Sequence, residues 1–160
     1  MAEPMPKNAT NLWAAPNLLL QKLPVPEFTV TTRVDVARLG ANQKAGLVVM
    51  GMDYSYVAVE RRSSGFLVVR YDCVNAPGGK PETLKSEATL GGGTALLRVK
   101  LSSGALCEFS FSPDGKDFFP IGRFQAMGGR WIGAKVGLFC SGNGKQSTGH
   151  ADFDWFRFES

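Results

Sequence analysis

The sequence predicts an all-β protein built as a two-sheet antiparallel β-sandwich, with about ten or more short strands and almost no helix. Three observations lead to this fold class. Apolar and polar residues alternate in several segments, 19 glycines and 9 prolines mark frequent turns, and no window holds apolar residues at helical spacing for three turns. Several strands are apolar on one face only, which favours a sandwich over a closed barrel.

The chain length points to one domain. With 160 residues, the chain can bury a core large enough to fold without a disulfide or a metal ion. Its hydrophobic content of 44% and charged content of 20% are typical of a globular protein. Residues 1–16 are rich in Pro, Ala and Asn, so we expect an irregular amino-terminal segment there and a single β-sandwich domain over residues 17–160.

Phe28 to Val36 is the clearest strand in the first half of the chain, because apolar and polar residues alternate along its whole length. A short strand is expected before it, ended by Pro24. Three more strands are expected after it as a meander, and the first of them is apolar on both faces and therefore central. These flanking strands are Asn17–Leu23, Ala45–Asp53, Tyr56–Arg62 and Phe66–Asp72.

The second half of the chain continues the pattern of short strands separated by Gly- and Ser-rich turns. Ser112-Pro113-Asp114-Gly115 carries the residues of a tight turn, with Pro at the position that requires its fixed φ. The strands expected here are an edge strand at Glu82–Leu90, then Ala95–Leu101, Ala105–Ser112 and Phe118–Phe124.

The carboxyl-terminal stretch Lys135 to Glu159 is predicted to be a hairpin of two apolar strands joined by a Gly/Ser/Asn-rich loop. In its second strand Phe153 and Trp155 alternate with Asp152 and Asp154. This period of two places both aromatic side chains in the core and both carboxylates on the opposite face.

The net charge of +4 raises the question of nucleic-acid binding. The basic residues are scattered singly, and only Arg61 and Arg62 stand together, whereas nucleic-acid binding requires a clustered basic face. Leu18-Leu19-Leu20 is far too short an apolar run for a membrane span. We therefore expect neither a nucleic acid nor a membrane as a partner.

The three cysteines cannot all pair with one another. Cys107 and Cys140 lie on apolar strand faces, where free thiols act as small buried hydrophobic groups, and Cys73 opens a loop. One disulfide stays open as an alternative in an oxidising compartment. No Cys/His spacing predicts a zinc site. The single histidine, His150, has no nucleophile placed beside it by any motif, so we expect it to be solvated or to cap a loop.

Four phrases of the sequence resemble one protein family. They are NLLLQKLPVPEFTVTTRVDV (17–36), AGLVVMGMDYSYVAVE (45–60), FSFSPDGKDFFPIG (109–122), and IGAKVGLFCSGN with GHADFDWFRFE (132–159). In this order they resemble the C-terminal domain of glycoside hydrolase family 43 enzymes, which include β-xylosidases and α-L-arabinofuranosidases. The resemblance covers nearly the whole chain from Asn11 onward and implies a concanavalin A-like jelly-roll sandwich.

In that family a five-bladed β-propeller carries catalysis and the sandwich follows it. The propeller with its catalytic carboxylates has no counterpart in this sequence, and the tryptophan-bearing strand that opens the family's sandwich ahead of Asn11 is missing as well. The resemblance therefore implies a fragment or a free-standing relative that is not catalytic alone. Its implied partners are a catalytic β-propeller domain and a plant-type oligosaccharide or polysaccharide, and a periplasmic or extracellular location is expected.

Asp152 and Asp154 decide whether the sandwich itself is a candidate enzyme. Along one strand face they lie about 7 Å apart, and inverting glycosidases separate their carboxyl groups by about 6.5–9.5 Å. Glucanases of concanavalin-like fold show a pattern resembling E-x-D-x-E, but the flanking positions here are His150 and Phe156, so both glutamates are missing. We interpret Asp152 and Asp154 as structural carboxylates that bind loop amides or neighbouring basic groups.

No cofactor is expected from the sequence. A structural calcium ion is the alternative, since Asp side chains and loop carbonyls suit it, but the sequence has no repeated acidic loop.

Arg130 and Trp131 are the strongest candidates for contact with a sugar. Trp131 ends a Gly-rich loop that can project, so its ring can stack on a sugar while Arg130 donates hydrogen bonds. The alternative is that Trp131 packs under the edge of the sandwich. Tyr54 and Tyr56, at a turn, are further candidates for lining a groove, with inward packing as the alternative.

Two functions follow as hypotheses. The first is a non-catalytic accessory domain that stabilises a hydrolase propeller, and the resemblance implies that a sandwich loop, at the position of Trp131, helps to close the propeller's substrate pocket. The second is an autonomous carbohydrate-binding module or lectin. A catalytic sandwich ranks third.

Overall fold

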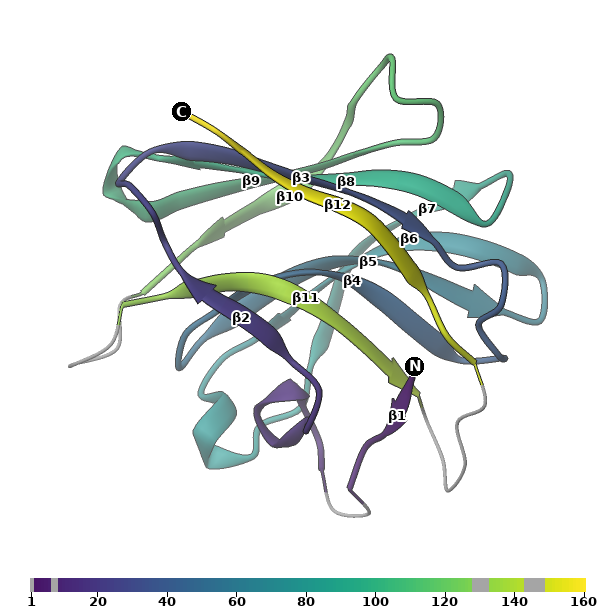
Figure 1. Ribbon diagram of the computed structural model, residues 1–160. Coiled ribbons are helices and arrows are strands. Elements are labelled where there is room, and N and C mark those ends of the chain that lie inside the picture. Colours follow the sequence, from purple (N-terminus) through teal and green to yellow (C-terminus); the bar gives the residue numbers. More distant parts are fainter. Residues whose placement is uncertain (1, 7–8, 128–132, 143–148) are drawn as a thin grey trace.

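The computed structural model of the chain describes residues 2–6, 9–127, 133–142 and 149–160. Two β-sheets pack face to face around an apolar core, as the ribbon in Figure 1 shows. Within the described ranges the helical content is limited to short 3-10 turns. The prediction of an all-β, two-sheet sandwich with almost no helix is therefore confirmed.

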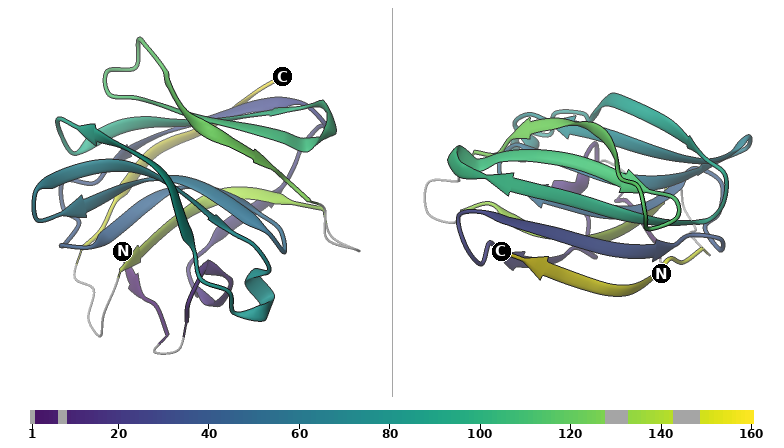
Figure 2. Two further views of the ribbon diagram at one scale, coloured as in Figure 1. Left: turned by 180° about the vertical axis from the view of Figure 1, so that it is seen from behind. Right: turned by 90° about the horizontal axis from the view of Figure 1, so that it is seen from above.

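One sheet has seven strands and the other has five, and Figure 2 shows the two layers from behind and from above. The seven-stranded sheet contains β1 (Glu3–Pro4), β2 (Leu19–Lys22), β4 (Gln43–Met50), β5 (Tyr54–Arg62), β6 (Gly65–Cys73), β7 (Thr83–Leu90) and β11 (Lys135–Gly142). The five-stranded sheet contains β3 (Phe28–Asp35), β8 (Thr94–Ser102), β9 (Leu106–Ser112), β10 (Phe119–Gln125) and β12 (Asp152–Glu159). The 3-10 turns are η1 (Leu12–Ala14), η2 (Ala76–Gly78) and η3 (Ser103–Ala105).

The strand order is β1-β11-β4-β5-β6-β7 in the seven-stranded sheet, where β2 also pairs with β11. In the five-stranded sheet the order is β10-β9-β8-β3-β12. Strand pairs are antiparallel except for the short pairing of β1 with β11. The predicted meander is present as β4, β5 and β6.

The main core lies between the two sheets. In β3, Val30 and Val34 are fully buried, whereas Arg33 lies on the opposite face with its side chain 40% exposed. Leu97 of β8 and Val57 of β5 belong to the same buried cluster, one from each sheet. Burying a side chain of this kind contributes about 1.5–3 kcal/mol. The alternation in the sequence therefore determines which face of each strand meets the core.

A second apolar cluster lies on the outer face of the seven-stranded sheet, beneath the amino-terminal segment. Leu12 of η1 is 1% exposed and belongs to this cluster together with Phe139 of β11. Strands β1 and β2 pair with β11 and cover the edge of the sheet. Residues 1–16, expected to be an irregular segment outside the sandwich domain, thus supply a short strand, a 3-10 turn and buried side chains to it.

The predicted hairpin over Lys135–Glu159 is wrong. Strand β11 pairs with β4 in one sheet and β12 pairs with β3 in the other, so the chain changes sheets between them (Figure 1). Two strands that are each apolar on one face satisfy that pattern equally well by pairing side by side or by lying on opposite sides of a core. The alternation specifies the buried face and leaves the pairing partner open.

The prediction that Trp155 faces the core is also wrong. The register of β12 against β3 shifts between Phe153 and Trp155, which is a β-bulge. Phe153 is opposite Val34 on the core face, whereas Trp155 is opposite Arg33 on the outer face. There the Trp155 ring lies 5.0 Å from the Arg157 guanidinium. One extra residue therefore inverts the alternation for the rest of the strand.

All three cysteines are free and buried. Cys107 and Cys140 belong to the main core, as predicted for small hydrophobic thiols. Burial raises the pKa of the Cys107 thiol to about 12. A thiol that stays protonated is a poor nucleophile, so Cys107 is chemically inert in the folded protein.

Replacing Gly46 in β4 by Ala is expected to lower the free energy of unfolding by about 1–3 kcal/mol. A Cβ atom at Gly46 would lie 2.2 Å from the Val57 carbonyl oxygen and 2.6 Å from the Ala58 Cα. These are backbone atoms, so the strands themselves have to shift. Urea denaturation measures the loss, with Gly91→Ala as control because nothing lies within 4 Å of a Cβ there. Equal stability of the two variants would contradict the prediction.

Candidate functional site

The strongest polar cluster in the described part of the chain lies on the outer face of the seven-stranded sheet. Tyr54 and Tyr56 of β5 are separated by one residue, so both side chains point to this face of the sheet. Both are 0% exposed. Their rings are stacked with centroids 6.3 Å apart, and Tyr56 also stacks on Tyr71 of β6 at 5.4 Å. The two tyrosines therefore pack inward under the amino-terminal segment instead of lining an exposed groove.

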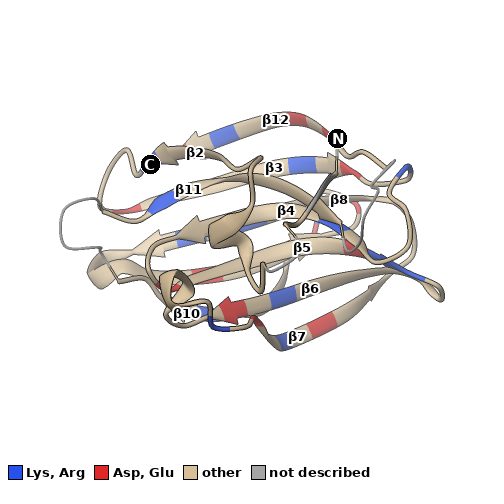
Figure 3. Ribbon diagram, turned by 90° about the horizontal axis from the view of Figure 1, so that it is seen from below, with Lys and Arg blue, Asp and Glu red and all other residues tan. Residues whose placement is uncertain are grey.

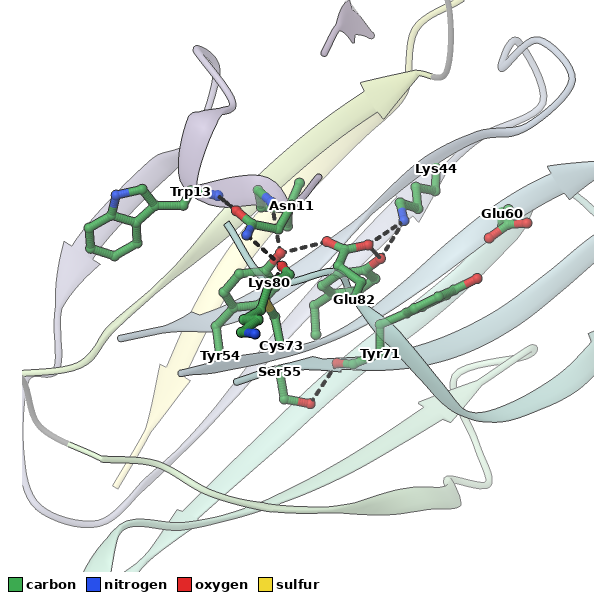
Figure 4. A network of polar contacts seen from close by, with 12 residues as sticks. Asn11, Trp13, Lys44, Tyr54, Ser55, Glu60, Tyr71, Cys73, Lys80 and Glu82 are labelled. Carbon is green, nitrogen blue, oxygen red and sulfur yellow. Dashed lines mark hydrogen bonds and ion pairs between the residues drawn. The ribbon is translucent and has the colours of Figure 1, made fainter. Parts of the chain in front are cut away.

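Glu82 binds both tyrosines through its carboxylate (Figure 4). The Tyr54 hydroxyl donates to Oε1 at 2.6 Å, and the Tyr56 hydroxyl donates to Oε2 at 2.8 Å. Lys44 of β4 donates to Oε2 at 3.0 Å and also to the Tyr56 hydroxyl. The Glu82 and Lys44 side chains are only 13% and 17% exposed. These four side chains, Lys44, Tyr54, Tyr56 and Glu82, are called the Glu82 cluster below.

The Glu82 cluster holds both phenols in their neutral form. Burial raises the pKa of Tyr54 far above its ordinary value of 10.0, and the negative charge of Glu82 raises it further. Burial and then Glu82 raise the pKa of Tyr56 in the same way. A neutral phenol is a hydrogen-bond donor, which the Glu82 carboxylate requires. The two hydroxyls therefore serve as fixed donors and not as acids.

The same cluster fastens the amino-terminal segment to the sheet. The Leu12 backbone N–H donates to the Tyr54 hydroxyl at 2.7 Å. Beside it, the Asn11 side-chain amide donates to the carbonyl oxygens of Ala76 at 3.0 Å and Lys80 at 2.7 Å. Asn11 Oδ1 also accepts from the Trp13 N–H at 2.9 Å and so caps η1. Hydrogen bonds from the Leu12 backbone and the Asn11 side chain thus hold the segment over the outer face.

A cavity of about 80 Å³ remains between the amino-terminal segment and the Glu82 cluster. Its walls include Thr10, Asn11 and Ser141 as well as Lys44 and Glu82. Sites for small organic ligands have volumes of about 300–1,000 Å³, so this cavity is too small for a sugar chain. It also presents one carboxylate, whereas glycoside hydrolysis requires two on either side of the bond. The arrangement suits structural support and does not suit hydrolysis.

The other predicted site residues lie elsewhere. Asp152 and Asp154 are exposed at the outer face of the five-stranded sheet, where Asp154 forms an ion pair with Arg33. Arg130 and Trp131 lie outside the described residues. His150 is close to Arg38, with its Nε2 atom 3.2 Å from an Arg38 nitrogen. The structure does not bring the aspartates and the tyrosines together.

Sequence reasoning missed Glu82 and Lys44. They lie 38 residues apart and belong to no shared motif. The available signal was weak: Lys44 is a single cation at the start of a strand that is otherwise apolar on both faces. Only the pairing of β4 with β5 and the return of the chain into β7 bring the two charges together.

No three His, Cys, Asp or Glu side chains converge as metal ligands within the described ranges. The prediction of no cofactor, with a structural calcium ion as the alternative, stays a prediction. Among the described residues, none of the helical segments has the length and apolar character needed to cross a membrane. Lys and Arg are mixed with Asp and Glu along the strands in the view of Figure 3.

The fold defines the class of protein, a concanavalin A-like β-sandwich module. Residues 5–159 match the family model described as "Beta xylosidase C-terminal Concanavalin A-like domain". The chain belongs to this family, the C-terminal module of glycoside hydrolase family 43 enzymes, and the resemblance seen in the sequence is confirmed. A search of curated proteins finds no significant match.

Solved structures of family 43 proteins share the fold. A "Bifunctional GH43-CE" protein of Bacteroides eggerthii is 22% identical, with a TM-score of 0.83 over 94% of this chain and 20% of its own. An engineered family 43 enzyme with endo-xylanase and exo-arabinofuranosidase activity is 18% identical, with a TM-score of 0.84 over 94% and 32%. The xylan β-1,4-xylosidase of Bacillus halodurans is 20% identical, with a TM-score of 0.72 over 89% and 29%. The chain therefore spans between a fifth and a third of these proteins.

Replacing Glu82 by Ala is expected to lower the free energy of unfolding by about 3 kcal/mol, because it leaves the buried Lys44 ammonium without its carboxylate. Urea denaturation measures the loss. Glu87→Ala is the matched control, since Glu87 is 45% exposed and pairs with Arg62 at 3.0 Å on the surface. That variant is expected to lose less than about 1 kcal/mol. A similar loss in both variants would show that the Glu82 cluster is no stronger than a surface ion pair.

The protein is expected to lose stability as the pH rises above about 10. The raised pKa values of Tyr54 and Tyr56 favour the neutral phenols in the folded state, so their contribution is complete below the ordinary pKa of 10.0 and falls above it as the unfolded chain ionises. Each phenol contributes up to about 1.4 kcal/mol per pH unit. The measurement is urea denaturation from about pH 8 to about pH 11. In the Tyr54→Phe variant the free energy of unfolding is expected to fall less between these pH values. The same dependence on pH in this variant and in the unchanged protein would contradict the role assigned to Tyr54.

Proposed function

We propose that this chain is a non-catalytic accessory domain of a family 43-type glycoside hydrolase that degrades xylan- or arabinan-type polysaccharide. In this role it packs on a catalytic β-propeller and helps to shape the propeller's substrate pocket. The observation that carries the proposal is the family match over residues 5–159.

The state of the acidic residues supports a non-catalytic role. Glu82 accepts hydrogen bonds from two phenols and an ammonium group, so both of its carboxylate oxygens are already engaged within the protein. Asp154 pairs with Arg33 on an exposed sheet face. A glycosidase acid faces a second carboxylate across the sugar, whereas Glu82 faces Lys44 and two phenols and Asp154 faces Arg33.

The covered outer face of the seven-stranded sheet favours an accessory role over an autonomous lectin. A lectin stacks its sugar on exposed aromatic rings. Here Tyr54 and Tyr56 are 0% exposed, and the amino-terminal segment lies over them with Leu12 buried at 1%. The face is therefore already occupied by the chain itself.

The described residues that flank Arg130 and Trp131 in the sequence support a role at a neighbouring pocket. Ala126 at 6% and Ala134 at 8% exposed are buried in the sandwich. Met127, the last described residue after β10, is 60% exposed. Arg130 and Trp131 follow in the sequence, and we propose that they face the propeller and its sugar.

The test is a chimera in which this chain replaces the sandwich of the Bacillus halodurans xylosidase, with the same enzyme lacking any sandwich as control. The chimera is expected to hydrolyse nitrophenyl β-xyloside faster than the control, because the sandwich acts only through contact with the propeller. Trp131→Ala is expected to lower the kcat/KM of the chimera. The isolated chain is expected neither to hydrolyse the xyloside nor to bind xylo-oligosaccharides in titration calorimetry.

Two results would contradict the proposal. Binding of xylo- or arabino-oligosaccharides by the isolated chain would favour an autonomous carbohydrate-binding module. A chimera that hydrolyses nitrophenyl β-xyloside no faster than the enzyme without a sandwich would contradict the accessory role.

A further inference from the structure

The loop that joins β6 to β7, residues 74–82, is fixed to two other parts of the chain. The Asn75 backbone N–H donates to Asp53 Oδ1 at 2.7 Å. The Asn11 side-chain amide holds the carbonyl oxygens of Ala76 and Lys80 (Figure 4). A loop tied down in this way presents its side chains in one arrangement, so a ligand that binds there does not have to order the loop first.

A pocket of about 390 Å³ opens beside this loop. Asp72 near the end of β6 and Thr83 at the start of β7 are paired across the two strands, and both line the pocket. Asn75 and Lys80 of the loop and Lys85 of β7 line it as well. We call this space the β6/β7 pocket. Its volume lies within the range of small-ligand sites, about 300–1,000 Å³, at the end that suits a single sugar ring.

The β6/β7 pocket carries an excess of positive charge. Lys80 and Lys85 are exposed, and neither forms an ion pair with another described residue. Asp72 is the one carboxylate among the described residues that line the pocket, and the buried Arg70 guanidinium donates to its Oδ1 atom at 2.7 Å. Arg70 compensates the charge of Asp72, so the charges of the two lysines remain. Two uncompensated ammonium groups at one pocket attract an anion.

Asp72 restricts which anion fits. Arg70 occupies its Oδ1 atom, whereas no donor among the described residues binds its Oδ2 atom. That free oxygen accepts a hydrogen bond from a hydroxyl and repels a second negative charge. An ion that is negative on all its sides, such as phosphate, therefore meets Asp72 unfavourably. A molecule with one carboxylate and several hydroxyls satisfies both the lysines and Asp72, and the Thr83 hydroxyl and Asn75 amide add donors and acceptors.

The remaining walls of the pocket are apolar. Val74, which is 65% exposed, and Pro81 line it beside the polar groups. An apolar wall with a few polar groups suits the carbon face and the hydroxyls of a sugar. We propose that the β6/β7 pocket binds a uronic acid residue, a sugar ring with one carboxylate, and that this carboxylate lies between Lys80 and Lys85. Membership of a carbohydrate-active family favours a sugar over other hydroxylated carboxylates.

This inference goes beyond the proposed function, because it assigns a ligand to the isolated chain. The two remain compatible, since neutral xylo-oligosaccharides carry no carboxylate to bridge the lysines. They also fail separately. Lys80→Gln in the chimera is expected to leave hydrolysis of nitrophenyl β-xyloside unchanged, because that substrate is neutral. A loss of that hydrolysis would show that Lys80 acts on the propeller and would overturn the separate pocket.

The test titrates the isolated chain with methyl glucuronide and follows its backbone amides by NMR. The largest shift changes are expected within residues 72–85. Methyl glucoside, in which a CH₂OH group replaces the carboxylate, is expected to bind at least about tenfold more weakly, because charge-assisted hydrogen bonds are lost. Lys80→Gln and Lys85→Gln are each expected to weaken glucuronide binding about tenfold. Lys116→Gln is the matched control, since it removes the same charge from an exposed turn that does not line the pocket.

The spectra of the variants also report whether each one folds, so a loss of binding is separated from a loss of structure. Equal binding of glucuronide and glucoside would overturn the role of the two lysines. Inorganic phosphate that binds as tightly as glucuronide would show a general anion site and overturn the uronic acid. Shift changes outside residues 72–85, an equal effect of Lys116→Gln, or no binding at all would overturn the pocket itself.

Discussion

The carboxylate of Glu82 is the interaction on which the architecture of this sandwich depends. A charge that is almost removed from water is tolerated only when hydrogen bonds replace its hydration. Two phenols and one ammonium group do so here, and one of the phenols in turn accepts from the backbone of the amino-terminal segment. The carboxylate thereby joins β4, β5, the approach to β7 and the segment that covers them.

This arrangement gives the seven-stranded sheet two buried faces. Its inner face belongs to the core between the sheets, and its outer face belongs to the cluster beneath Leu12. Covering the outer face leaves Tyr54 and Tyr56 with no exposed ring surface. Among the described residues, the most exposed large apolar side chain is Leu19 of β2, at 73%.

The sequence was sufficient to predict the local geometry of single strands. It was insufficient to predict which strands pair and which distant side chains meet. Strict alternation in Phe28–Val36 specified a strand and its buried face, because a period of two has one physical cause. The same rule failed at Trp155, since a single bulged residue inverts the alternation without altering composition. The alternation also led to the incorrect prediction that β11 pairs with β12. Adjacency in the chain carries no information about which sheet a strand joins. Glu82 and Lys44 were missed for the related reason that their contact exists only after distant strands have assembled.

The change of sheet between β11 and β12 has a consequence for folding. The Thr32 hydroxyl of β3 bonds to the Trp155 carbonyl oxygen across 123 residues of sequence, and Asn17 bonds to the Cys140 carbonyl across the same separation. Contacts of such high sequence separation form slowly, because loop-closure entropy opposes them until much of the chain is ordered. β12 forms the border of the five-stranded sheet and β11 joins β4 to β1 and β2 in the other sheet, so β3 and β4 each lack one neighbouring strand until the final quarter of the chain is made. A cell that makes this protein has to protect those edges during translation.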